Sequence, residues 1–141
     1  MRIFHGYYLL TAATIGLTIL IVGCDSPPAG KVKVTGTVEW QGEPLPDGAI
    51  EFFLVEGDLL GGAAQIEAGR FRFFSKPGKM RVQISASRPI PGASANELLS
   101  PDLQYIPERY NANSELTAEV TLDGKNHFVF SLTENPDESQ A

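Results

Sequence analysis

Apolar and polar residues alternate with a period of two over much of the chain after residue 30. In segment 31–40, three valines, Gly36 and Trp40 fall on one side, whereas lysines, threonines and a glutamate fall on the other. This alternation predicts a β-strand with one buried face. Comparable short apolar or alternating segments follow at 49–55, 63–66, 70–75, 79–87, 116–122 and 128–132.

The connections between these segments are rich in turn-forming residues. The chain has 14 glycines and 10 prolines, which favours turns over a helical bundle. Asp123-Gly124, between the last two segments, predicts a β-hairpin. Segment 88–115 contains four prolines and predicts a long irregular connection. The pattern predicts an all-β domain of about seven strands, arranged as an antiparallel Greek-key sandwich of two sheets without a further helix.

The first part of the chain has a different pattern. Residues 7–22 form a continuous run without a charged residue, and Arg2 precedes it. The run is shorter than the roughly 20 residues of a membrane-spanning helix. It therefore predicts a helical signal peptide, with an uncleaved membrane anchor as the alternative.

This apolar run ends in Gly23-Cys24 and resembles the lipobox of bacterial lipoproteins. The resemblance implies cleavage before Cys24, acylation of its thiol and new amino group, and attachment to membrane lipid. Cys24 is the only cysteine, so it has no internal disulfide partner. A free or intermolecular thiol is the alternative. The expected organisation is a signal peptide over 1–23, a lipidated cysteine and proline-rich tether over 24–30, a β-sandwich over 31–133 and a polar tail over 134–141.

Three stretches of the expected domain resemble small planctomycete-type lipoproteins with a transthyretin-like or carboxypeptidase-regulatory-like sandwich. The first, 34–49, has the pattern V-x-G-x-V followed by G-x-P-L. The second, 69–82, has a proline-glycine turn before a strand. The third, 106–132, ends in an N-x-F-x-F-x-L strand. The molecular function of this family is largely unassigned, so the resemblance implies a fold and a location in the cell envelope.

Two residues within these stretches have expected structural roles. Gly36 lies inside a predicted strand, where a glycine leaves room for a bulge or a neighbouring ring. Tyr110 shortly precedes a late strand. We expect it to act like the tyrosine corner of immunoglobulin-type sandwiches, with its hydroxyl bonded to a backbone group.

The charge of the chain argues against one class of partner. The net charge is −6, and removal of residues 1–23 leaves 10 basic and 17 acidic residues, a net charge of −7. An acidic surface repels phosphate backbones, so no nucleic-acid partner is expected. A basic strip is expected on facing strands, serving either charge balance or contact with a polyanion or lipid headgroup; its residues are Arg70, Arg72, Lys79 and Arg81.

The residues after the leader indicate no catalytic residue, cofactor or metal site. His127 is the only histidine after the leader, and it lies on the strand face opposite Phe128, as a solvated histidine does. A zinc site needs more histidine or cysteine ligands. The acidic residues show no calcium-loop spacing, and the candidates considered are Asp47, Glu56, Asp58, Glu67 and Asp102.

Binding residues are predicted more readily than catalytic ones. Trp40 ends the first strand, and Tyr105 lies on the long connection, where sandwiches commonly carry recognition. The apolar residues of that connection form a partner surface or cap the core; they are Leu98, Leu99, Leu103, Tyr105 and Ile106.

The sequence therefore predicts a non-catalytic, membrane-anchored lipoprotein that presents a binding or structural module, with an envelope protein or glycan as the partner. A carbohydrate- or small-ligand-binding module is the alternative, and exposure of Trp40 and Tyr105 would favour it. A pocket that gathers His127 with carboxylates or arginines would favour an enzyme.

Overall fold

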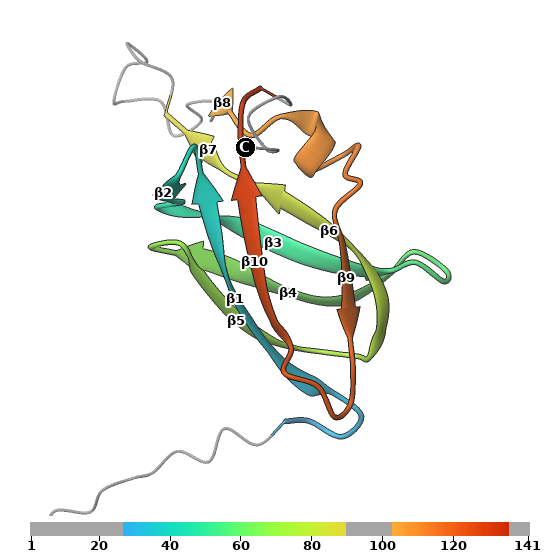
Figure 1. Cartoon of the computed structure of the whole chain (residues 1–141). Coiled ribbons are helices and arrows are strands. Elements are labelled where there is room, and N and C mark those ends of the chain that lie inside the picture. Colours follow the sequence, from blue (N-terminus) through green and yellow to red (C-terminus); the bar gives the residue numbers. More distant parts are fainter. Residues whose placement is uncertain (1–26, 90–102, 136–141) are drawn as a thin grey trace, which may run out of the picture.

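The computed structural model describes residues 27–89 and 103–135, and these residues form an all-β fold (Figure 1). A 3₁₀ turn, η1 (Glu108–Tyr110), is the one helical element among them. The strands are β1 (Val32–Trp40), β2 (Glu43–Pro44), β3 (Asp47–Leu54), β4 (Leu59–Glu67), β5 (Arg70–Ser75), β6 (Gly78–Ser85), β7 (Ser87–Arg88), β8 (Leu103–Gln104), β9 (Thr117–Val120) and β10 (His127–Leu132).

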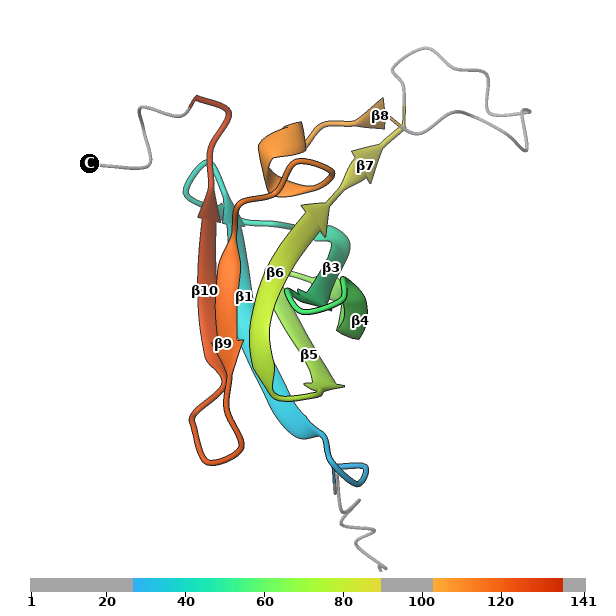
Figure 2. The same cartoon turned by 90° about the vertical axis from the view of Figure 1, so that its right-hand side faces the viewer.

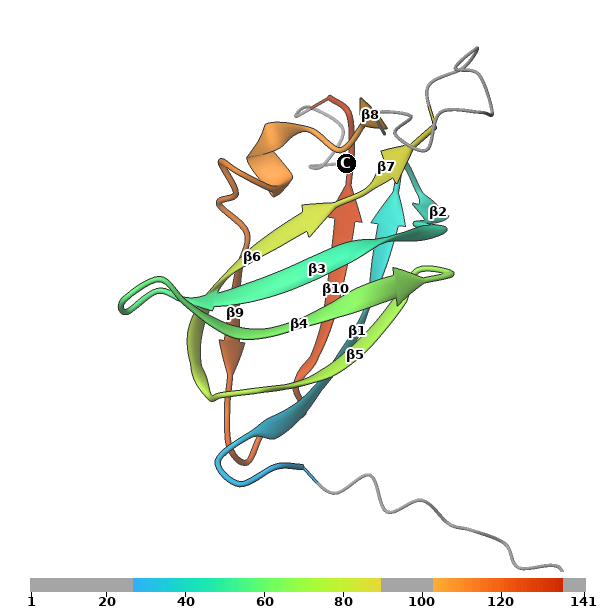
Figure 3. The ribbon, with the colours of Figure 1, turned by 180° about the vertical axis from the view of Figure 1, so that it is seen from behind.

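Seven of these strands form one curled sheet in the order β10-β1-β5-β4-β3-β6-β9. The short strand β2 pairs with β1, and β7 and β8 form a separate ribbon. The pairings are antiparallel except that between β1 and β10, which is parallel. The predicted all-β class is confirmed. The observed architecture is one continuous curled sheet (Figures 1 and 3).

The inside of the curl is filled by phenylalanines. Phe52 on β3 is fully buried, and its ring lies 5.0–6.3 Å, centroid to centroid, from four others: Phe71, Phe73, Phe128 and Phe130. These rings come from β3, β5 and β10, so they join distant parts of the strand path. Aromatic contacts at such distances add to the stabilisation from burial alone.

The connection from β4 to β5, between the predicted segments 63–66 and 70–75, is a tight turn. Ala68 and Gly69 both have positive φ, 48° and 74°, as the centre of a type I′ hairpin requires. Glu67 and Arg70 are the flanking strand partners.

The predicted hairpin at Asp123-Gly124 is wrong. β9 pairs with β6 and β10 pairs with β1, so these consecutive strands lie at opposite ends of the strand path. The connection between them is closed by a side chain: the Asn126 carboxamide accepts from Thr121 N and donates to Thr121 O, each at 2.9 Å. Leu122, the last residue of the predicted segment 116–122, lies beyond the end of β9 and is 66% exposed.

The domain has two ends, which β1 connects (Figure 2). At the proximal end lie residues 27–33, 75–78 and 121–126: Val32 pairs with Ser75, Gly78 pairs with Val120, and Thr35 N donates to Asn126 O. At the distal end lie residues 40–47, 86–89, 103–113 and 132–135. β1 has nine residues, so about 30 Å separates the ends.

Candidate functional site

The two predicted binding residues, Trp40 and Tyr105, contact one another at the distal end. Their ring centroids lie 5.9 Å apart with an interplanar angle of 69°. Trp40 is the last residue of β1, and Tyr105 directly follows β8. Both are half-buried against the core, so each ring combines a packed edge with an accessible part.

The side chain of Gln104 fixes the position of Tyr105. Its Oε1 accepts from Ala86 N at 3.0 Å and from Ile106 N at 3.2 Å, which fastens the β8 segment to the end of β6. Tyr105 N also donates to Ala86 O at 3.2 Å. Ile106 is 3% exposed and belongs to the core, so of the two alternatives for this residue the structure supports the cap on the core. Leu98 and Leu99 lie outside the described residues.

Two charged residues complete this site. The Arg88 guanidinium lies over the Tyr105 ring, 5.4 Å from its centroid, in cation–π geometry. Burial raises the pKa of the Tyr105 hydroxyl; the Asp47 charge raises it further and the Arg88 charge opposes both. Arg88 is a residue that sequence reasoning missed, because the stretch between it and Tyr105 carries no periodic signal.

These residues border an open hollow of about 640 Å³, which we call the aromatic hollow. Its volume falls within the range of small-ligand sites. Its wall is partly apolar, and its polar groups come from strand ends and turns. Residues that define it are Trp40, Glu43, Pro44, Asp47, Arg88 and Tyr105.

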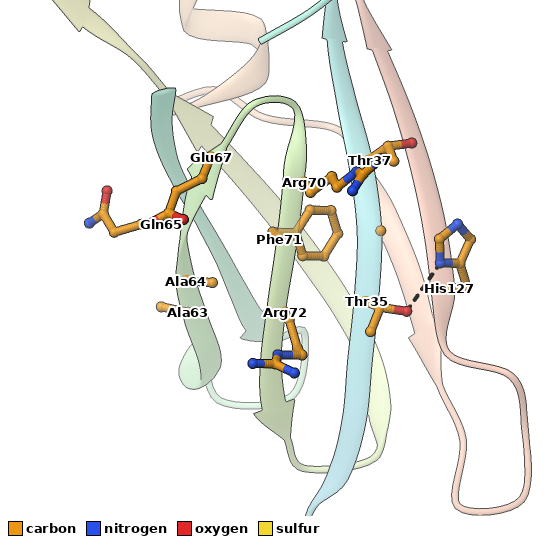
Figure 4. Close-up of a pocket in the computed structure, with 11 residues that line it drawn as sticks. Thr35, Thr37, Ala63, Ala64, Gln65, Glu67, Arg70, Phe71, Arg72 and His127 are labelled. Atoms are coloured by element: carbon orange, nitrogen blue, oxygen red, sulfur yellow. Dashed lines mark hydrogen bonds between the residues drawn. The ribbon is translucent and has the colours of Figure 1, made fainter. Parts of the chain in front are cut away.

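A second hollow, of about 720 Å³, lies on the outer face of β10, β1, β5 and β4 (Figure 4). We call it the histidine hollow. His127 borders it, and its Nδ1 lies 3.1 Å from the Thr35 hydroxyl. Glu67, Arg70 and Arg72 border it as well. The hollow therefore gathers His127 with a carboxylate and two arginines, which is the residue set that would favour an enzyme.

The geometry of the histidine hollow does not form an acid–base pair. Glu67 is on β4 and His127 is on β10, which are three strand-to-strand steps apart. Neighbouring strands are about 4.8 Å apart, so these steps amount to roughly 14 Å. Figure 4 shows the two side chains on opposite sides of the hollow, with Thr37 and Phe71 between them. A carboxylate orients a catalytic histidine at hydrogen-bond distance, which this arrangement exceeds.

The ring beside Gly36 is that of Phe71. A Cβ at residue 36 would lie 2.1 Å from Phe128 O and 2.5 Å from the Phe71 ring. These distances leave no room for a side chain, so the glycine permits close approach of β10 and the core ring.

The Tyr110 hydroxyl forms a hydrogen bond with a backbone group that lies far from Tyr110 in the sequence. Its hydroxyl accepts from Thr133 N at 3.2 Å, which joins η1 to the chain just after β10. Burial raises the pKa of Tyr110, but hydrogen bonds from Thr133 and Arg109 outweigh it and lower the net pKa. The contact therefore differs from an immunoglobulin-type corner, in which the hydroxyl bonds the backbone a few residues upstream.

The expected basic strip is not continuous. Arg70 and Arg72 are on β5 and Lys79 and Arg81 are on β6, and these strands are not neighbours. Arg81 forms an ion pair with Asp58 at 2.5 Å.

The described residues show neither a metal-binding cluster nor a membrane-spanning helix. Across 27–89 and 103–135, histidine, cysteine, aspartate and glutamate form no group of three placed to hold a metal ion. In the same ranges no helix has the length and apolarity needed to cross a membrane. Cys24, the signal peptide and Asp102 lie outside the described residues.

Comparison with known proteins supplies no family for this chain. No protein-family model matches it, and no curated protein sequence matches it.

Proposed function

We propose that this chain is a lipid-anchored protein of the bacterial cell envelope that acts by binding a ligand at the aromatic hollow. The observation that carries the proposal is the contact between Trp40 and Tyr105, with Arg88 over the Tyr105 ring, at the end of the domain opposite residues 27–33. Segment 27–33 continues from Cys24. An anchored domain would therefore present this hollow away from the membrane.

The anchor is proposed from the sequence. The apolar run over 7–22, Gly23-Cys24 and the proline-containing segment that follows resemble a lipoprotein leader. The described residues contain no helix that could cross a membrane. Acyl chains on Cys24 would give the chain its membrane affinity. The test is fractionation and intact mass of wild type and Cys24→Ser. Wild type is expected in membranes as an acylated chain that lacks 1–23, and the variant as a soluble chain or uncleaved precursor. Equal fractionation and mass would contradict the anchor.

The ligand that fits the aromatic hollow best is a carbohydrate. A sugar ring has an apolar face of C–H groups and a rim of hydroxyls. A half-exposed aromatic ring matches the face, and carboxylate and guanidinium groups match the rim. Arg88 covers one face of Tyr105, so Trp40 offers the remaining platform. An envelope protein with an exposed aromatic or sugar-bearing segment is the alternative partner.

Trp40 provides its own reporter, because it is the only tryptophan of the chain. Short cello-, manno- and chito-oligosaccharides are the probes, added separately to the full-length protein in detergent. A saturable change of Trp40 emission with one of them supports the proposal. Unchanged emission with all three, together with no change in the unfolding midpoint, contradicts carbohydrate binding.

The finer fold assignment is part of the same proposal. A transthyretin-like or carboxypeptidase-regulatory-like sandwich is supported by the motifs over 34–49, 69–82 and 106–132. The seven-strand curled sheet is compatible with it.

A further inference from the structure

The proximal end carries a charge opposite to that of the whole chain. Its three segments, 27–33, 75–78 and 121–126, contain four lysines and one aspartate, whereas the chain has a net charge of −6. All four lysines are exposed: Lys31, Lys33, Lys76 and Lys125. The distal segments contain four acidic and two basic residues. The domain is therefore polarised along β1.

The same end carries an exposed apolar residue. Leu122 lies in the β9–β10 connection and is 66% exposed. This connection is held in shape by the two Asn126–Thr121 hydrogen bonds. Figures 1 and 2 show it at the end of the domain where residues 27–31 enter. An exposed leucine at an end of the domain that also carries four lysines fits a surface that enters the lipid interface with its charges at the headgroups.

We propose that the proximal end docks on an anionic lipid surface and orients the domain upright on the membrane. The inference rests on the anchoring proposed for Cys24, which would place residues 27–33 within a few residues of the bilayer. Lysines attract anionic headgroups within about a Debye length, roughly 8–10 Å in physiological salt. A basic patch adds electrostatic attraction to the hydrophobic affinity of the acyl chains, so docking would also strengthen membrane retention. The acidic distal end would be repelled by the same surface.

The test places a reporter at the proposed contact. Full-length Leu122→Trp is reconstituted into vesicles with brominated acyl chains, composed of phosphatidylcholine alone or of equal parts phosphatidylcholine and phosphatidylglycerol. Bromine quenches tryptophan only at short range. We expect strong quenching of the added tryptophan in the anionic vesicles and weak quenching in the neutral ones. Wild type reports on Trp40 at the distal end and is expected to stay unquenched in both.

Charge variants separate docking from anchoring. In the Leu122→Trp background, Lys76→Glu with Lys125→Glu is expected to abolish the quenching, while the protein still floats with the vesicles. Arg70→Glu with Arg88→Glu makes the same charge change elsewhere and is expected to preserve quenching. Flotation without quenching in the anionic vesicles overturns the docking inference and leaves the anchor intact. Absence of flotation overturns the anchor. Equal quenching in neutral and anionic vesicles overturns the role of the lysines.

Discussion

The ring of Tyr105 packs edge-on against the ring of Trp40, with 5.9 Å between the ring centroids and an interplanar angle of 69°, although the two residues lie far apart in the sequence. One is carried by the end of β1, and the other by the chain that follows β8. The Gln104 side chain and the Ala86 backbone set this meeting point. The aromatic hollow is therefore built by strand ends with fixed positions rather than by a single loop, as a preformed site requires.

Asp47→Asn is expected to lower the pKa of Tyr105, because the Asp47 charge raises it in the wild type. Absorbance titration of the phenolate, as a difference from Tyr105→Phe, measures this. The pKa of Tyr105 is higher in the folded state than the value of about 10 expected in the unfolded state. The folded state therefore holds the phenol proton more tightly, and the free energy of unfolding falls as the pH rises above about 10. Glu43→Gln removes another carboxylate of the hollow and serves as the control. Equal titration curves for Asp47→Asn and wild type would show that the Asp47 charge does not raise the pKa of the Tyr105 hydroxyl.

Gly36→Ala is expected to destabilise the fold by about 2 kcal/mol or more, the scale of overpacking in a core. The added methyl would overlap Phe128 O and the Phe71 ring. Urea unfolding measures the loss. Thr37→Ala, at a half-buried position of the same strand, is the control and should cost about 0.5 kcal/mol or less. A Gly36→Ala protein as stable as wild type would show that β10 does not approach β1 this closely.

The strands could be predicted from sequence because each signal is local. Val34, Phe52 and Val82 are buried where a period of two places them. The parallel pairing of β1 and β10 could not be predicted in this way, because it joins segments from opposite ends of the domain. Asp123-Gly124 gives a local hairpin signal, but the pairing of β10 with β1 overrides it.

The candidate site shows the same division. Trp40 and Tyr105 could each be selected from the sequence as an aromatic residue at the end of a strand or on a long connection. Their contact, and the Arg88 cation above Tyr105, depend on the pairing of β7 with β8. That two-stranded ribbon is too short to leave an alternating pattern, so the position of Arg88 could not be predicted from the sequence.

Tyr110→Phe is expected to cost about 1 kcal/mol, the scale of one hydrogen bond. The variant keeps the buried ring, which lies 4.7 Å from the Arg109 guanidinium, and loses the acceptor for Thr133 N. Denaturant unfolding measures the difference. Tyr110→Leu, which also removes the ring, should cost more. Wild-type stability in Tyr110→Phe would rule out the role of the hydroxyl.

Asn126→Ala is expected to cost about 2 kcal/mol, because it leaves the N–H and C=O of Thr121 without their side-chain partner. Asn126→Asp keeps the acceptor and loses the donor, so its cost should be smaller. Lys125→Ala, at the adjacent exposed position, is the control and should be nearly neutral. If Asn126→Ala matched Lys125→Ala in urea unfolding, the carboxamide would not close the β9–β10 connection.

The most direct test of the central claim is an oligosaccharide titration, followed by Trp40 emission, of wild type, Tyr105→Ala and His127→Ala. The aromatic hollow predicts saturable binding in wild type and His127→Ala, and at least a tenfold loss of affinity in Tyr105→Ala, equal to about 1.4 kcal/mol. Binding that survives in Tyr105→Ala and is lost in His127→Ala would contradict the account and place the ligand in the histidine hollow.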